Sequence, residues 1–123
     1  MLEFLAVGLG GFLGSCLRYA VTKLTEGFSP FPFGTLISNV VAGLFVGFVL
    51  GLDKQSPGFP KHSKLFLTTG LMGGLSTFSA FSFETVELFG SGRHASCIGN
   101  VLLNLCLSLS GVALGLAVAK KFV

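Results

Sequence analysis

The sequence has very little charge: Asp, Glu, Lys and Arg make up 11% of its 123 residues, against roughly 25% in an average soluble domain. A globule this small has a large surface relative to its volume and needs many polar side chains to cover it. With 51% apolar residues and a mean hydropathy of +0.85, this chain cannot supply that cover. The composition excludes a soluble enzyme, a nucleic-acid-binding module and a disordered chain, and it predicts a protein surrounded by membrane lipid over most of its length.

Proline and cysteine are scarce, and neither forms a functional pattern. The four prolines all lie outside the long apolar stretches, at Pro30, Pro32, Pro57 and Pro60. The three cysteines lie inside them, at Cys16, Cys97 and Cys106, with no spacing typical of a metal site. We interpret these thiols as small packing residues. Only Glu3 is charged before the first apolar stretch, so the basic start of a signal peptide is missing and we expect no cleavable leader.

Four stretches are long and apolar enough to cross a bilayer, which takes about 20 residues per helix. Their predicted bounds are about 4–22, 33–52, 65–89 and 95–119. Because the connections between them are short, we expect an all-α membrane protein with a single transmembrane domain over residues 1–123. The sequence therefore predicts a multi-pass membrane protein, with helices as its only regular structure.

An even number of spans puts both termini on one side of the membrane. Five lysines share that side: Lys54, Lys61, Lys64, Lys120 and Lys121. Fewer basic residues lie toward the other side: Lys23, Arg93 and, near the end of the first span, Arg18. The positive-inside rule therefore favours cytoplasmic termini by a small margin. So small a bias is compatible with a chain that inserts in both orientations.

Glycine is abundant, and 14 of the 18 glycines lie inside the predicted spans. Helices in lipid associate by close backbone packing, which small residues permit. Pairs four residues apart recur in every span: Gly10 and Gly14, Gly43 and Gly47, Gly70 and Gly74, and Gly111 and Gly115. Packing within one bundle accounts for most of them. Because four helices have few interior faces, glycine faces on all four also predict that a second copy packs against the first.

The third span has an unusual centre, in which the pair Gly73-Gly74 precedes a run of hydroxyl and phenyl side chains. Glycine is a poor helix former, so we predict a break near the middle of this helix. A break would free backbone carbonyls at mid-membrane, which is tolerated only where the backbone is buried in protein or lines a cavity. Free carbonyls are ligands for a hard cation. A kinked but continuous helix is the alternative.

Polar side chains at membrane depth are few and costly, which makes each one a candidate for function. Asn39 in the second span can line a pore as a donor or bond a neighbouring helix. Arg18 can snorkel to the lipid headgroups or draw anions into a vestibule. Asn104 and Ser108 recur at helical spacing in the fourth span and can complete a polar track.

Phe78 and Phe81 are three residues apart and share one helix face. Such rings usually pack or contact lipid, but a phenyl ring also has a positive edge, which can meet an anion without offering a full charge. This suits a small, strongly hydrated anion. Such an ion must lose water to be selected, and yet be held loosely enough to leave.

Three long motifs, in this order and in a chain of this size, are similar to those of the Fluc/CrcB family of bacterial fluoride channels. They are Gly10–Tyr19 in the first span, Phe33–Gly43 in the second and Thr68–Glu84 in the third. The resemblance covers essentially the whole chain. It implies an antiparallel, dual-topology homodimer with two separate fluoride pathways, which passively exports fluoride from the cell and limits its toxicity.

The resemblance also implies roles for individual residues of the fluoride pathway. Asn39 matches the family's pore asparagine. Phe78 and Phe81 match the phenylalanines whose ring edges face the ion, and Ser79 matches the hydroxyl between them. Arg18 matches the arginine near the vestibule.

Two further assignments concern the third and fourth spans. The backbone carbonyls of Gly73 and Ser76 match the site of a structural Na⁺ at the dimer centre, an ion that is not transported in the family. On the fourth helix some members carry a hydroxyl where this chain has Val112. We therefore take Ser108 and Asn104 as the candidates of that helix for the pathway.

A proton-coupled small multidrug transporter is the main alternative, because it would also be a four-span, dual-topology dimer. Such a transporter needs an ionisable carboxylate at mid-membrane. The first span has only Glu3, at its very end, and Glu84 lies beyond the predicted break, where it can pair with a basic residue. A packing subunit without transport activity is a second alternative, but an inert helix gains nothing from a polar break.

Overall fold

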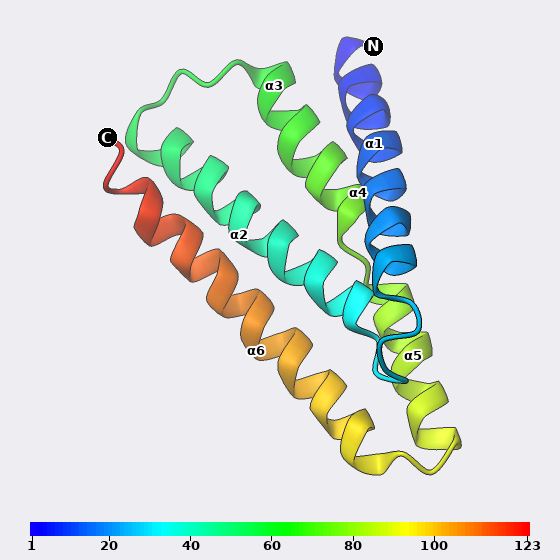
Figure 1. Cartoon of the computed structure of the whole chain (residues 1–123). Coiled ribbons are helices and arrows are strands. Elements are labelled where there is room, and N and C mark those ends of the chain that lie inside the picture. Colours follow the sequence, from blue (N-terminus) through cyan, green and yellow to red (C-terminus); the bar gives the residue numbers. More distant parts are fainter.

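The computed structural model describes all residues 1–123, and its regular structure is entirely helical (Figure 1). Three spans are single helices: α1 (Leu2–Thr25), α2 (Phe33–Gln55) and α6 (His94–Ala119). The third span consists of α3 (Lys61–Leu65), the π-helix η1 (Phe66–Met72), the short α4 (Gly73–Leu75) and α5 (Phe78–Gly90). All four spans are long and apolar enough to cross a membrane, which confirms the all-α, four-span prediction.

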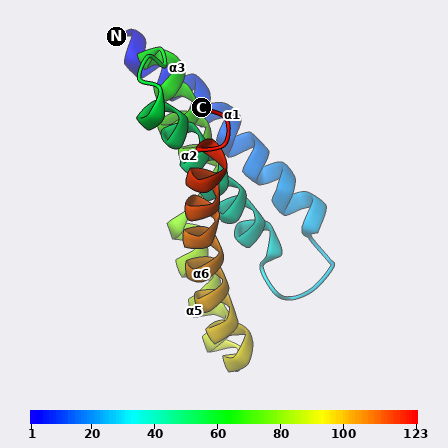
Figure 2. The ribbon, with the colours of Figure 1, turned by 90° about the vertical axis from the view of Figure 1, so that its left-hand side faces the viewer.

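The chain runs up and down so that both termini and the α2–α3 connection lie at one end of the molecule (Figure 1). The α5–α6 connection lies at the opposite end. In the view turned by 90°, the α1–α2 connection lies to one side of α5 and α6, which extend beyond it (Figure 2). The five lysines expected on the side of the termini are at the ends of α2 and α6 and in α3, all at that end.

Close packing of α2 against α6 depends on glycine. A Cβ atom on Gly47 would collide with the carbonyl oxygen of Val112, and one on Gly43 would lie 2.9 Å from the carbonyl oxygen of Ser108. In the other direction, a Cβ on Gly115 would collide with the carbonyl of Leu44. The two backbones therefore touch, as the glycine spacing predicts for helices in lipid.

The glycines of the third span serve a second contact of this kind, against α1. A Cβ on Gly74 would lie 2.5 Å from the carbonyl oxygen of Gly11, and one on Gly70 would lie 2.8 Å from that of Val7. On the α1 side of this contact, Gly10 and Gly14 lie equally close to the backbone of the third span. Glycine at these positions is therefore explained by helix packing within one chain.

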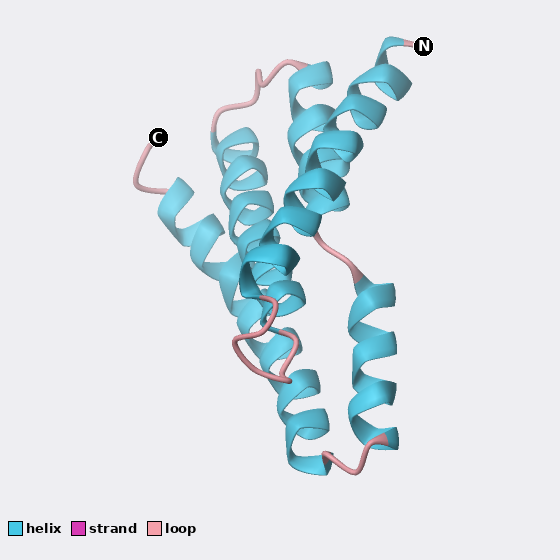
Figure 3. Cartoon of the chain, turned by 45° about the vertical axis from the view of Figure 1, so that its right-hand side comes forward, coloured by secondary structure: helices cyan, strands magenta, loops and turns pink.

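The third span bends at Ser76 and Thr77, which are extended (φ −77°, ψ 153° and φ −153°, ψ 124°) and join α4 to α5 (Figure 3). The sequence predicts an interruption at the preceding pair, Gly73-Gly74, but both glycines are in α4. The reason is the contact with α1: Gly74 is small because α1 crosses there, and it keeps helical dihedrals.

The surface of the four-span unit is apolar. Only 20 of 123 residues are buried, and large side chains such as Phe12, Phe45 and Leu109 are at least half exposed. The two largest side chains that are almost fully enclosed are polar, with Asn100 0% and Ser38 1% exposed. An apolar outer surface with polar side chains kept inside suits a lipid solvent.

Candidate functional site

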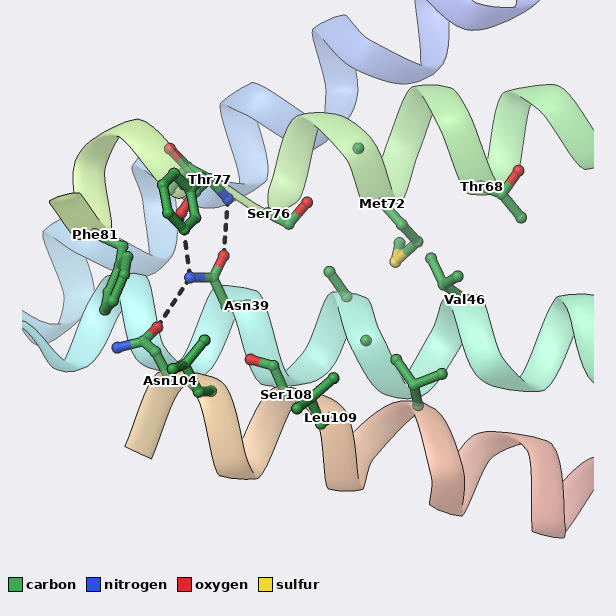
Figure 4. Close-up of a pocket in the computed structure, with 16 residues that line it drawn as sticks. Asn39, Val46, Thr68, Met72, Ser76, Thr77, Phe81, Asn104, Ser108 and Leu109 are labelled. Atoms are coloured by element: carbon green, nitrogen blue, oxygen red, sulfur yellow. Dashed lines mark hydrogen bonds between the residues drawn. The ribbon is translucent and has the colours of Figure 1, made fainter. Parts of the chain in front are cut away.

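An open groove of about 550 Å³ lies at mid-span between α2, α6 and the bent third span (Figure 4). Sixteen residues line it, and none of them carries a formal charge. Five of the seven side chains predicted for a pathway are among them: Asn39, Phe78, Phe81, Asn104 and Ser108. Gly73 and Ser76, predicted to offer carbonyls, also line the groove. Ser79 and Arg18 are not part of its lining.

Asn39 secures the bend of the third span from the facing helix α2. Its Oδ1 accepts a hydrogen bond from the backbone N–H of Thr77 at 2.8 Å, and its Nδ2 donates to the Thr77 carbonyl at 3.2 Å. Without these bonds an extended residue at mid-span would leave two backbone groups unpaired, which is costly in lipid. Nδ2 also donates to Oδ1 of Asn104 at 2.9 Å. Asn39 thus bonds neighbouring helices and lines the groove at the same time.

The two phenylalanine rings lie together at the start of α5. Their centroids are 5.4 Å apart, and the rings are inclined by 55°. Phe81 is buried (8% exposed), whereas Phe78 is 74% exposed in the single chain. The first turn of α5 is fixed by a cap, because Thr77 Oγ1 accepts from the N–H of Ala80 at 3.2 Å. Ser79 reaches this cap, with its Oγ 3.2 Å from Thr77 Oγ1.

The bend removes the helical donors of several backbone carbonyls, among them those of Gly73 and Ser76. In a continuous helix the N–H of Thr77 would donate to the carbonyl of Gly73, but it donates to Asn39 instead. The N–H of Ala80 would donate to the carbonyl of Ser76, but it donates to the Thr77 hydroxyl. The carbonyls of Gly73 and Ser76 are therefore available at the groove, while no group of three acidic, His or Cys side chains offers a metal site elsewhere.

Arg18 reaches the third span from α1. Its Nε donates to the carbonyl of Gly74 at 3.1 Å, which satisfies another carbonyl at the C-terminal end of α4. This half-buried side chain therefore bonds protein backbone from the far side of the third span. The bond places a positive charge next to the bend and outside the groove.

Sequence reasoning missed several polar partners of the site. Asn104 Nδ2 donates to Asn100, which in turn donates to Thr85. The spacing of four residues between Asn100 and Asn104 was the available signal, since it places them on one helix face. Glu84 pairs with no basic residue; its Oε1 accepts a hydrogen bond from the Thr35 hydroxyl at 2.7 Å.

Ser108 has the only free hydroxyl among the predicted pathway residues of α6. Its Oγ is buried and has no hydrogen-bond partner in the protein. The residue lines the groove beside Asn104 (Figure 4). Because the Oγ atom itself has almost no exposed surface, its O–H can reach a molecule or ion in the groove only after the side chain rotates.

The fold and the groove define a class: a four-span helical membrane protein whose central site is built from amide, hydroxyl, carbonyl and phenyl groups without formal charge. A family model described as CrcB-like protein, Camphor Resistance (CrcB), matches residues 5–116. Two relatives named fluoride-specific ion channel FluC, from Clostridium novyi (strain NT) and Clostridium perfringens (strain 13 / Type A), are 46% and 44% identical to this chain. The alignments cover 93% and 98% of this chain and 91% and 95% of the relatives.

A third relative of the same name, from Bordetella petrii, is 42% identical over 96% of this chain and 91% of its own length. The chain belongs to the CrcB family, which confirms the resemblance carried by the three motifs. It is a multi-pass protein of the plasma membrane and not an enzyme.

Proposed function

We propose that this chain is a fluoride-selective channel, which passively exports fluoride across the plasma membrane and lowers its toxicity. The observation that supports it most directly is the uncharged groove in which the Asn39 amide and the Phe81 ring lie beside the bend. Relatives at 42–46% identity are named fluoride-specific ion channels. A small anion needs donors and positive ring edges to replace its water, and a site without formal cations releases it again.

The proposed pathway follows the groove past residues of three spans. Asn39 and Ser108 offer donors, Phe78 and Phe81 offer ring edges, and Asn104 faces Asn39 from α6. In the proposal Ser79 adds its hydroxyl at the start of α5, and Arg18 attracts anions toward the bend through its charge. A proton-coupled multidrug transporter is not supported, because no carboxylate lines the groove.

The working unit in this proposal is an antiparallel, dual-topology homodimer. In the single chain the groove is open and Phe78 is 74% exposed beside it, so a second copy would close the pathway. The nearly balanced distribution of basic residues between the two ends permits insertion in both orientations. The bend at Ser76 and Thr77 takes the place of the break predicted in the third helix.

A structural Na⁺ fits the free carbonyls of the bend. The carbonyls of Gly73 and Ser76 each lack the N–H donor that a continuous helix would supply. Carbonyl oxygens suit a hard cation. In an antiparallel dimer two such pairs would face each other. The ion would supply a fixed positive charge at the dimer centre, and the residues of this chain would hold it with backbone oxygens alone.

The deciding experiment uses purified protein in liposomes, with fluoride and chloride efflux followed by ion-selective electrodes. We expect fluoride to leave rapidly and chloride to be retained. Equal rates for the two ions, or no fluoride efflux, would contradict the proposal.

Phe81→Ile should lower fluoride efflux while the dimer stays intact, because isoleucine fills space but has no positive ring edge. A loss of roughly tenfold is expected, since an interaction of about 1.4 kcal/mol changes a rate or equilibrium by that factor. The control is Phe45→Ile, which changes a half-exposed ring on the outside of α2. Wild-type efflux from the Phe81 variant would remove this ring from the pathway.

Replacement of Na⁺ by a bulky organic cation during purification and assay should impair fluoride efflux. The reason is that four carbonyl oxygens facing one another at the bend repel when no cation lies between them. Efflux and dimer content are measured with N-methylglucamine and again after Na⁺ is returned. Indifference to the cation would count against a metal site at Gly73 and Ser76.

A further inference from the structure

All three asparagines of this protein are joined in one series of hydrogen bonds, and two of them, Asn39 and Asn104, line the groove. Asn39 Nδ2 donates to Asn104 Oδ1 at 2.9 Å. Asn104 Nδ2 donates to both the carbonyl and the Oδ1 of Asn100, at 2.9 Å each. The two members on α6 are enclosed, with Asn104 5% and Asn100 0% exposed. No other asparagine occurs in the 123 residues.

The direction of these bonds is fixed by backbone groups at both ends. At one end the Thr77 N–H needs an acceptor and the Thr77 carbonyl needs a donor, so Asn39 can be oriented in only one way. Its Nδ2 then faces Asn104, which must present its oxygen. At the other end Nδ2 of Asn104 lies 2.9 Å from both the backbone carbonyl and the Oδ1 of Asn100, and only a donor can face these two oxygens. Both amides are therefore held in a single orientation.

The chain of donors continues from α6 into α5. Asn100 Nδ2 donates to Thr85 Oγ1 at 2.9 Å, and the Thr85 hydroxyl donates to the carbonyl of Phe81 at 2.7 Å. Every bond from Asn39 to Phe81 thus points the same way. Consecutive bonds of one direction in a low-dielectric site strengthen one another. The last acceptor belongs to the residue whose ring lines the groove.

The consequence concerns the donors of Asn39. An asparagine has two N–H donors, and both of Asn39 are used, one by the Thr77 carbonyl and one by Asn104. An anion that takes a hydrogen bond from Asn39 must therefore replace one of these acceptors. The Thr77 backbone is bonded to Asn39 at two points, through its N–H and its carbonyl, whereas the Asn104 oxygen belongs to a side chain that can rotate.

We propose that Asn104 is an internal competitor for fluoride: its side-chain oxygen occupies the donor of Asn39, and the anion passes by taking its place. This inference rests on the proposed fluoride channel. Asn100 and Thr85 are positioning residues, which hold the Asn104 amide with its oxygen toward Asn39. The strength of the hydrogen bonds that Asn100 and Thr85 make sets how readily fluoride displaces the Asn104 oxygen. When fluoride binds at Asn39, the environment of Asn104 changes with it.

The test uses the full-length channel labelled with ¹⁵N at asparagine, which gives three side-chain amide signals per chain. The signals are assigned with the single variants Asn100→Ser and Asn104→Ser. Sodium fluoride is titrated, with sodium chloride as the control. We expect the Asn39 and Asn104 signals to shift with one common midpoint in fluoride and to stay in place in chloride. A fluoride shift at Asn39 with Asn104 unmoved, or no shift at Asn39, would overturn the inference.

A matched pair of variants tests the positioning role. Thr85→Val keeps the shape of the side chain and removes the acceptor of Asn100, whereas Thr85→Ser keeps the hydroxyl. Because a neutral hydrogen bond contributes about 1 kcal/mol, Thr85→Val should lower the fluoride midpoint by up to about fivefold, and Thr85→Ser should leave it unchanged. A purely structural role of Thr85 predicts no tighter binding. An unchanged midpoint in folded Thr85→Val overturns the positioning role.

The outcome separates this inference from the function on which it rests. Absence of fluoride efflux from wild-type liposomes would contradict the proposed channel. Fluoride efflux together with an Asn104 amide signal that does not shift when fluoride is added would contradict only the competitor role. If Thr85→Val does not fold, the wild-type titration still decides whether Asn104 is displaced.

Discussion

Asn39→Asp is expected to abolish fluoride efflux, with a loss of about 100-fold or more. Aspartate has the shape of asparagine, but its ionised carboxylate has no hydrogen-bond donor. The carbonyl of Thr77 and the Oδ1 of Asn104, which now accept from Asn39 at 3.2 and 2.9 Å, would each face a carboxylate oxygen. Each unpaired buried acceptor costs about 1–3 kcal/mol. A negative charge in the groove would also repel the anion.

The measurement is fluoride efflux from liposomes that contain equal amounts of dimeric protein. Gln55→Glu is the matched control, because it makes the same amide-to-acid change at the exposed end of α2, where Nε2 of Gln55 donates only to the carbonyl of Gly51. The control should behave as the wild type. Asn39→Asp with efflux near the wild-type rate would show that the Asn39 amide is not needed for conduction.

Gly47→Ala is expected to destabilise the protein strongly. Its Cβ would collide with the carbonyl oxygen of Val112, a backbone atom that moves only if α6 moves away from α2. Overpacking of this kind costs about 1–3 kcal/mol. Because α2 carries Asn39 and α6 carries Asn104, a wider gap would also stretch the bond between the two amides. Both the unfolding midpoint in detergent and the fluoride efflux should fall.

Gly99→Ala on α6 is the control for the glycine prediction. The nearest atom to a Cβ at Gly99 is 4.0 Å away, on the ring of Phe31, so a methyl group fits without displacement. Its unfolding midpoint should equal or exceed that of the wild type, since alanine favours helix over glycine. Equal stability of the two variants would mean that α2 and α6 can separate without cost.

Hydropathy predicts the four spans because a backbone in lipid has few ways to satisfy its hydrogen bonds. A segment in the bilayer core must satisfy its own hydrogen bonds, so a long apolar run becomes a helix whatever its neighbours do. The cost of polar groups in lipid likewise identifies Asn39, Asn104 and Ser108 as candidates, and all three line the groove. These predictions need only local composition and helical spacing.

The position of the bend shows where local information ends. Gly73-Gly74 predicts a weak helix, but both residues are helical, and the backbone of α1 crosses beside Gly74. A glycine that weakens a helix and a glycine that admits a neighbouring backbone are identical in the sequence. The extended residues are Ser76 and Thr77, where Asn39 supplies the bonds that a helix would have supplied.

Composition and motifs alone identified the lipid environment of this protein, its four helices, its family and seven of the sixteen residues that line its groove. Which partners those side chains bond follows from how the helices pack. The bonds of Asn39 to Thr77 and of Asn100 to Thr85 join residues 38 and 15 positions apart. The physical reason is that a buried amide must be paired, but its partner is set by the crossing of helices, and that crossing depends on backbone contacts at glycines far from the amide itself.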